Sequence, residues 1–135
     1  MSAAGFVASL QICPGHRKPM LPLHEVRVLT NRGLEADMHS LEKNTRQVLL
    51  LEGETSDSLQ RSPGEVKENI PTRNIALMTL SRNQLLAIGE VRLQTVLSAG
   101  GTPSGSPEAS EGRRRIPARV VRGGLIRRGE QIELL

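Results

Sequence analysis

The chain has 135 residues, of which 37% are hydrophobic, and this is enough for one packed domain and argues against disorder throughout. Phe6 is the only aromatic residue, so the sequence lacks the rings on which single-stranded nucleic acids stack. The formal net charge is +4, and all but three of the 18 basic residues are Arg, whose planar guanidinium groups suit phosphate and carboxylate partners.

Cysteine content and hydropathy bear on location. Cys13 is the only cysteine, so no internal disulfide forms and nothing indicates an oxidising compartment. The N-terminus has no charged segment followed by an apolar core, and no apolar run approaches the roughly 20 residues that cross a bilayer. We therefore expect a cytoplasmic protein without a membrane segment.

Short apolar runs separated by Gly, Pro or Asn follow one another along the chain, a pattern typical of strands. We expect strands at Phe6–Ile12, Glu25–Thr30, Arg46–Leu51, Gln84–Ile88, Val91–Leu97, Ala118–Val121 and Gln131–Leu134. One segment, about Glu54 to Gln60, has helical character, with Thr55 as the expected cap of the first turn and Pro63-Gly64 as the stop.

Alternation is clearest after a turn expected at Gly89-Glu90. There Val91, Leu93 and Thr95 share one face and the residues between them share the other, as in a half-buried strand. The whole pattern predicts an all-β, mainly antiparallel β-barrel with one or two short helices, because closure removes exposed strand edges. We expect a single domain over residues 1–135, with its core at about 6–134 and a mobile loop at about 98–112, which is rich in Gly, Pro and Ser.

Polar residues at the edges of these runs form an ordered series. The segments are Gly33-Leu34-Glu35-Ala36-Asp37-Met38-His39, Arg46-Gln47-Val48-Leu49-Leu50-Leu51, Pro63-Gly64-Glu65-Val66-Lys67-Glu68-Asn69-Ile70-Pro71-Thr72 and the Arg-rich stretch from Ala118 to Glu130. In this order they resemble the MOSC domain, a family named for the C-terminal domain of molybdenum-cofactor sulfurases. The resemblance covers about Phe6 to Leu134, is strongest at Glu68-Asn69-Ile70, and implies the same kind of β-barrel.

The resemblance also implies function. It suggests binding of the molybdenum cofactor (molybdopterin) or a related phosphate-bearing anion, and a molybdenum-cofactor enzyme or a cysteine desulfurase as partner. Family-level terms include molybdenum-ion binding, pyridoxal phosphate binding and sulfur carriage. Pyridoxal phosphate belongs mainly to members with a separate aminotransferase-like domain, for which this chain has no room. Whether the chain is an enzyme is left open, and no catalytic residue is assigned.

The cofactor is a pterin with a phosphate, so its pocket needs amide donors and cations. By residue type and resemblance, the expected binding residues are Asn69, Glu68, Arg46, Thr72, Asp37, His39 and Arg119. Each has a plainer interpretation: Asn69 as a turn residue, Glu68 as a solvated carboxylate, and Asp37 with His39 as a surface hydrogen bond. The family usually has Gly before this Asp and a basic residue after it, where this chain has Ala36 and Met38.

One family feature is missing. Where MOSC domains usually carry a cysteine after the long strand, this chain reads Leu97-Ser98-Ala99-Gly100-Gly101-Thr102-Pro103-Ser104. Serine is far harder to ionise than cysteine and is a harder ligand, so it does not replace a persulfide-carrying thiolate. The leading hypothesis is a MOSC-like binding domain without sulfur-carrier activity of its own; whether Cys13 takes over that role is open.

An alternative from another class rests on the C-terminal quarter. Its basic residues are Arg113, Arg114, Arg115, Arg119, Arg122, Arg127 and Arg128. They would suit a basic interaction module that binds nucleic acid or an acidic protein. Steep loss of affinity with salt would distinguish such a module from an enclosed pocket. The three His residues are not spaced as a metal site.

Overall fold

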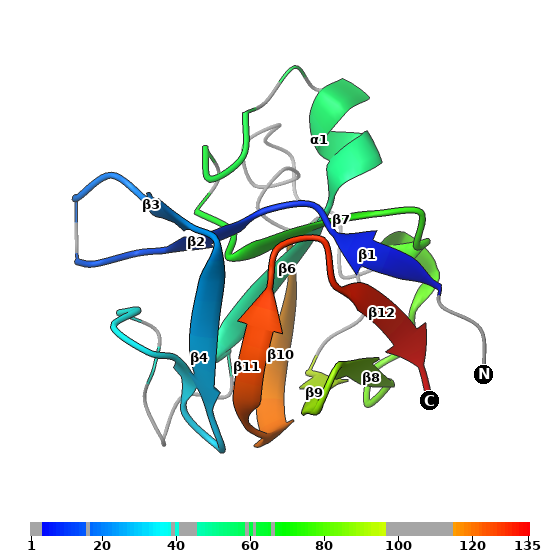
Figure 1. The fold of residues 1–135 in the computed structure, drawn as a ribbon. Coiled ribbons are helices and arrows are strands. Elements are labelled where there is room, and N and C mark those ends of the chain that lie inside the picture. The colour runs from blue at the N-terminus through cyan, green and yellow to red at the C-terminus, as the bar shows by residue number, and fades with distance from the viewer. Residues whose placement is uncertain are drawn as a thin grey trace.

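A closed barrel forms the body of the protein (Figure 1). The computed structural model describes residues 4–15, 17–38, 40, 46–58, 60, 62–65, 67–96 and 115–135. Within them, the strands of the barrel follow the order β1-β12-β8-β9-β10-β6-β7. Their bounds are β1 (Gly5–Val7), β6 (Val48–Glu52), β7 (Ile70–Arg73), β8 (Leu85–Ile88), β9 (Val91–Thr95), β10 (Arg115–Arg122) and β12 (Gln131–Leu134).

Two smaller sheets adjoin the barrel. In one, β4 (Glu25–Leu29) lies between β11 (Gly124–Arg127) and β5 (Gly33–Leu34); in the other, β2 (Leu10–Ile12) pairs with β3 (Leu21–Leu23). In Figure 1, β2, β3 and β4 lie on the left of the view. The chain thus leaves the barrel after β1, forms β2 to β5 and returns to the barrel at β6, and β11 joins β4 later, between β10 and β12.

The barrel closes through one parallel pair among the described strands, β6 with β7, in which Leu50 lies opposite Ile70. Parallel neighbours need a crossover connection, and here it contains the helix α1 (Gly53–Ser58), which lies at the top of the barrel in Figure 1. The other described pairs are antiparallel, and η1 (Leu77–Thr79) is a single 3-10 turn. The prediction of a mainly antiparallel barrel with short helices is confirmed.

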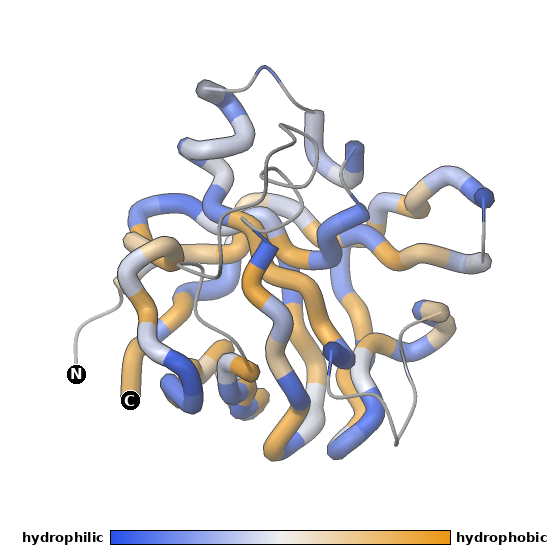
Figure 2. Tube along the Cα trace, turned by 180° about the vertical axis from the view of Figure 1, so that it is seen from behind, coloured by the Kyte–Doolittle hydropathy of each residue, from blue (hydrophilic) through white to orange (hydrophobic). Residues whose placement is uncertain are grey.

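Aliphatic side chains fill the barrel. In β9, Val91, Leu93 and Thr95 are buried whereas Arg92 and Gln94 are half-exposed, so the predicted alternation is confirmed. Figure 2 shows the apolar residues along the strands and hydrophilic residues along α1 and the turns. Burial of this apolar surface, at about 25 cal/mol per Å², is the main force that holds the barrel closed.

The structure also corrects several element boundaries. The expected strand Phe6–Ile12 divides into β1 and β2, and β10 begins at Arg115 rather than at Ala118. The strand β7 was not expected, because Ile70-Pro71-Thr72-Arg73 contains one aliphatic residue and a proline. It forms because Ile70 fills the interior and the backbone on both sides pairs with β6 and β1.

The predicted helix is present as α1, but Thr55 does not cap it. The helix begins earlier, at Gly53, and the Thr55 hydroxyl donates a hydrogen bond of 2.7 Å to Glu52 Oε1 instead. The first residue of the helix is glycine because any Cβ at position 53 would lie 2.5 Å from the carbonyl oxygen of Thr72 in β7. The close approach of α1 to the barrel therefore depends on this glycine.

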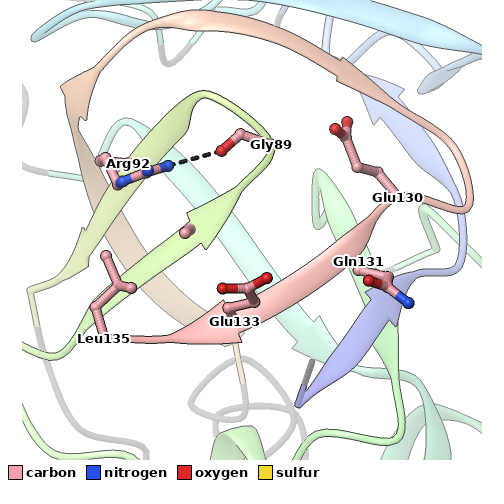
Figure 3. Close-up of a pocket in the computed structure, with 7 residues that line it drawn as sticks. Gly89, Arg92, Glu130, Gln131, Glu133 and Leu135 are labelled. Atoms are coloured by element: carbon pink, nitrogen blue, oxygen red, sulfur yellow. Dashed lines mark hydrogen bonds between the residues drawn. The ribbon is translucent and has the colours of Figure 1, made fainter. Parts of the chain in front are cut away.

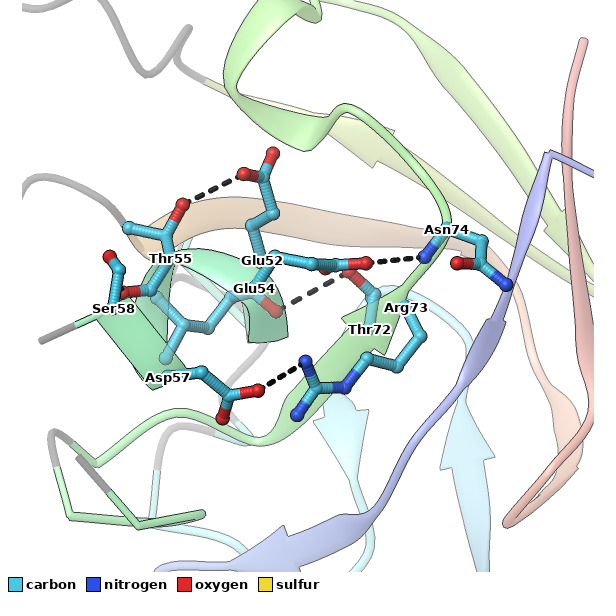
Figure 4. A network of polar contacts seen from close by, with 9 residues as sticks. Glu52, Glu54, Thr55, Asp57, Ser58, Thr72, Arg73 and Asn74 are labelled. Atoms are coloured by element: carbon cyan, nitrogen blue, oxygen red, sulfur yellow. Dashed lines mark hydrogen bonds and ion pairs between the residues drawn. The ribbon is translucent and has the colours of Figure 1, made fainter. Parts of the chain in front are cut away.

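Side chains fasten α1 to β7 (Figure 4). Arg73 Nη1 donates to Asp57 Oδ2 at 2.7 Å, and the Asn74 backbone N–H donates to Glu54 Oε2 at 2.8 Å. The hydrogen bond from Arg73 lowers the pKa of the exposed Asp57 carboxyl. These contacts fix the helix as one wall of the cleft described below.

Two further expectations from the sequence concern a loop and membrane segments. The segment Ser98–Gly112, expected to be a mobile loop, lies outside the described residues. In the part of the chain that is described, none of the helices has the length and apolar character that a membrane span requires.

Candidate functional site

Asn69 lies at the junction of four segments and is fully buried. Its Oδ1 accepts a hydrogen bond of 2.9 Å from the Leu49 backbone N–H in β6. Its Nδ2 donates to the Gln11 carbonyl oxygen at 3.2 Å and to Asp37 Oδ1 at 3.1 Å. The amide therefore joins β6, β2 and the Asp37 loop to the start of β7, and we call this set of contacts the Asn69 junction.

Asp37 completes the junction from the loop after β5. It is 5% exposed, and its Oδ1 also accepts a 2.6 Å hydrogen bond from the Cys13 backbone N–H. The residue before it, Ala36, has φ of 66°, in the left-handed region that favours glycine. The turn that aims Asp37 at Asn69 thus places a residue with a Cβ in a conformation that favours glycine.

A charge cluster lies next to this junction. Glu68 is fully buried, and Gln11 Nε2 donates to its carbonyl oxygen at 3.2 Å. Burial lowers the pKa of the half-buried Arg115, the positive charge of Arg46 lowers it further, and the negative charge of Glu68 raises it. Residues far apart in the sequence therefore bring two guanidinium groups and one carboxylate within electrostatic range of one another.

Glu68 also lines a cleft between α1, β7 and the segment that joins β1 to β2. The cleft has a volume of about 390 Å³, within the range of small-molecule sites. Its lining includes Phe6, Ser9, Ser56, Glu68, Arg73 and Arg128. A single apolar ring, hydroxyl groups and guanidinium groups therefore face the same space.

The lining of the cleft carries two carboxylates, Asp57 and Glu68, and two guanidinium groups, Arg73 and Arg128. Asp57 is paired with Arg73, and Glu68 interacts with Arg115. Arg128 makes no side-chain hydrogen bond or ion pair with any residue that the structure describes, whereas its neighbour Arg127 contacts Glu25 at 3.3 Å. The Arg128 guanidinium, which no described side chain engages, is thus the group at the cleft that is available to an anionic ligand.

The structure brings some of the predicted site residues together and separates others. Asn69 contacts Asp37, and the charges of Glu68 and Arg46 both act on the pKa of Arg115. Thr72 is buried in β7 and donates to the Leu51 carbonyl oxygen at 3.4 Å, and Arg119 lies exposed on β10 with its Nε donating to Gln94. His39 lies outside the described residues.

Sequence analysis missed Arg115, Arg128 and Gln11 as site residues. Both arginines belonged to the basic C-terminal quarter, but nothing in the sequence distinguished them from their neighbours. An earlier start for β10 would have drawn attention to Arg115, because the first residue of a barrel strand lies at a barrel rim. Gln11 alternates with Leu10 and Ile12 in a short strand, and this pattern alone does not predict a buried amide.

Cys13 is close to the junction, but its thiol does not line the cleft. The residue is 4% exposed, and Sγ lies 3.4 Å from the Gly15 carbonyl oxygen and 3.2 Å from Met38 Sδ. Only its backbone N–H reaches Asp37. Among the described residues, no three His, Cys, Asp or Glu side chains gather as a metal site.

Comparison with solved structures places the chain in a known fold. The YuaD protein of Bacillus subtilis matches with a TM-score of 0.77 and 15% identity, over 96% of this chain and 94% of that one. YiiM of Geobacillus stearothermophilus matches with a TM-score of 0.67 and 15% identity, over 97% of this chain and 75% of that one. YiiM of Escherichia coli gives a TM-score of 0.62 and 14% identity, with 96% and 69% covered.

YiiM is a MOSC-domain protein, so the fold of this chain is MOSC-like. No protein-family model matches the sequence, and no curated protein matches it either. At these identities the likeness concerns the fold alone.

We predict that Asn69→Ala lowers the free energy of unfolding by about 2 to 4 kcal/mol, because it removes three hydrogen bonds and leaves the buried Leu49 N–H without an acceptor. Urea denaturation measures this change. Asn83→Gly is the control, since it removes an exposed Asn from a backbone with φ of 68° and should change stability little. A loss below about 1 kcal/mol for Asn69→Ala would contradict the junction.

We predict that Ala36→Gly raises the free energy of unfolding by about 1 kcal/mol, because glycine adopts the left-handed conformation without the Cβ clash. Ala76→Gly is the matched control. Ala76 is exposed with φ of −81°, so glycine there should lower stability through backbone entropy. Thermal or urea unfolding of the two variants should therefore shift in opposite directions, and equal shifts would refute the assignment of strain to position 36.

Proposed function

We propose that this chain is a MOSC-like binding module whose cleft takes a phosphate-bearing ligand of the molybdopterin type, and that it has no sulfur-carrier activity of its own. The observation that carries the proposal is the Arg128 guanidinium at the cleft, which pairs with none of the described side chains, whereas Arg73 is paired with Asp57. A phosphate at Arg128 would receive charge-assisted hydrogen bonds, which are about twice as strong as neutral ones.

The remaining lining suits the organic part of such a ligand. Phe6 offers an apolar face, and the Ser9 hydroxyl, which donates to Gln11 Oε1, offers acceptor lone pairs to a heterocycle edge. In this proposal Asn69 and Asp37 act indirectly, because they hold Glu68 and β7 in place instead of touching the ligand. Arg46 and Arg115 would add positive potential beside Glu68.

The fit to the whole molybdenum cofactor is partial. The cations and hydroxyls suit its phosphate and pterin, whereas no thiol among the described residues faces the cleft as a ligand for the metal. We therefore derive no chemical step through the metal. The buried Cys13 thiol, directed at Gly15 and Met38, supports the proposal that sulfur is not carried here.

We predict that Arg128→Ala weakens ligand retention about 10-fold or more, because a hydrogen bond to a charged group contributes about 1.5 to 3 kcal/mol. The protein is incubated with molybdopterin released from a donor protein, and the retained pterin is measured by fluorescence after oxidation. Arg82→Ala is the control, since Arg82 is equally exposed but does not line this cleft.

Retention that is equal in wild type and Arg128→Ala would overturn the assignment of the cleft. An equal loss in both variants would show an effect of net charge. Retention that falls steeply with salt, together with binding of a random oligonucleotide, would favour the basic interaction module instead.

We predict that incubation with a cysteine desulfurase and free cysteine adds no sulfur to the protein, because the single described thiol is buried. Intact-mass spectrometry is the measurement, with a cysteine-containing MOSC protein as positive control. One added sulfur that disappears in Cys13→Ser would show that Cys13 carries a persulfide and that the chain is a sulfur carrier after all.

A further inference from the structure

A second hollow lies on the outer face of the barrel over β8, β9 and β12 (Figure 3). It has a volume of about 460 Å³, and its lining includes Ala87, Gly89, Arg92, Glu130, Glu133 and Leu135. It shares no lining residue with the cleft of the proposed function. The hollow is large enough for a small molecule.

The strand register explains why the hollow exists. Ala87 in β8 lies opposite Glu133 in β12 on one side and opposite Arg92 in β9 on the other. Neighbouring strands are about 4.8 Å apart, so the backbones that carry Glu133 and Arg92 are separated by roughly 10 Å. The methyl group of Ala87 fills little of that interval, and an acidic and a basic side chain face each other across it.

Backbone contacts at the Gly89 turn hold two of the charges in place. Arg92 Nη1 donates to the carbonyl oxygens of Gly89 at 2.7 Å and Val91 at 3.1 Å. Glu130 Oε1 accepts a 3.0 Å hydrogen bond from the Arg127 N–H, and its other oxygen lies where a Cβ at position 89 would stand. Because residue 89 is glycine, Glu130 can lie against the turn.

These charges do not neutralise one another. Within the described part of the chain, no ion pair joins Arg92 to Glu130 or Glu133, and all three side chains are half-buried. Figure 3 shows Arg92 and Glu130 on opposite sides of Gly89, with Glu133 on the neighbouring strand. Charges that are already positioned lose little conformational entropy when a ligand binds.

We propose that this hollow binds a small zwitterion whose ammonium and carboxylate groups are separated by several bonds. The ammonium group faces Glu133 and Glu130, and the carboxylate faces Arg92, whose guanidinium retains donors beyond the two contacts with the turn. An α-amino acid carries both charges on one carbon, so a longer spacing matches the separation of the two strands better. The inference does not depend on the proposed function.

Titration with 6-aminohexanoate tests the proposal, followed by the amide NMR signals of Gly89, Arg92 and Gln131. Hexanoate and hexylamine, which each lack one charged end, are the matched ligands. We expect saturable shifts with 6-aminohexanoate and at least 10-fold weaker binding of the other two. The absence of a saturable shift would overturn the proposal. Hexylamine binding as tight as that of 6-aminohexanoate would also overturn it, because it would indicate an acidic surface without a role for Arg92.

Variants locate the binding. Glu133→Gln should weaken 6-aminohexanoate binding at least 10-fold, whereas Glu35→Gln, an equal change of charge in the turn after β5, should leave it unchanged. Ala87→Val adds two methyl groups to the lining of the hollow without a change of charge, and it should also weaken binding. The test therefore does not depend on one variant. Unchanged affinity in both Glu133→Gln and Ala87→Val would refute the site.

Discussion

The candidate site depends on the burial of one amide side chain. Transfer of an unpaired amide from water into the interior costs several kcal/mol, so Asn69 is tolerated only where partners surround it. The Leu49 N–H, the Gln11 carbonyl and the Asp37 carboxylate supply these partners from three different segments. Because one planar group must satisfy all of them, the relative positions of β6, β2 and the Asp37 loop are fixed together.

The position of Glu68 follows from this arrangement. It directly precedes Asn69, its carbonyl is held by Gln11, and its carboxylate is buried beside the cleft. A buried carboxylate is costly unless positive charge lies near it, and Arg115 at the start of β10 provides that charge. Arg128, from the turn after β11, then remains as the guanidinium at the cleft that no described side chain engages. The charge of the site is therefore assembled from both halves of the chain.

The likeness to YuaD and YiiM shows how little identity this fold needs. With 15% identity, the chain still superimposes on YuaD with a TM-score of 0.77. In this chain, alternating aliphatic residues, the glycine at the start of α1 and the crossover between β6 and β7 shape the barrel. Ala36 adopts the left-handed conformation, which is costly for a residue with a Cβ, in the turn that leads to the contact of Asp37 with Asn69.

The sequence by itself determined the class of fold. Local alternation, as in β9, and strand-length apolar runs depend on near neighbours, and these predicted the barrel, the turn at Gly89 and the short helix. The resemblance at Glu68-Asn69 also directed attention to a segment that the structure buries. Only the tertiary structure decided what these residues do, because the partners of Asn69 lie 20, 32 and 58 positions away.

The same limit applies to the charged residues. The sequence presented a basic C-terminal quarter without a way to rank its arginines. Pairing of β10 with β6 set Arg115 beside Glu68, while Arg119 went to the outer face and Arg127 to an ion pair. The row of Glu133, Ala87 and Arg92 exists only through the register of three strands. Whether an arginine binds a ligand, a neighbour or water depends on which strands meet, and that is a property of the closed barrel.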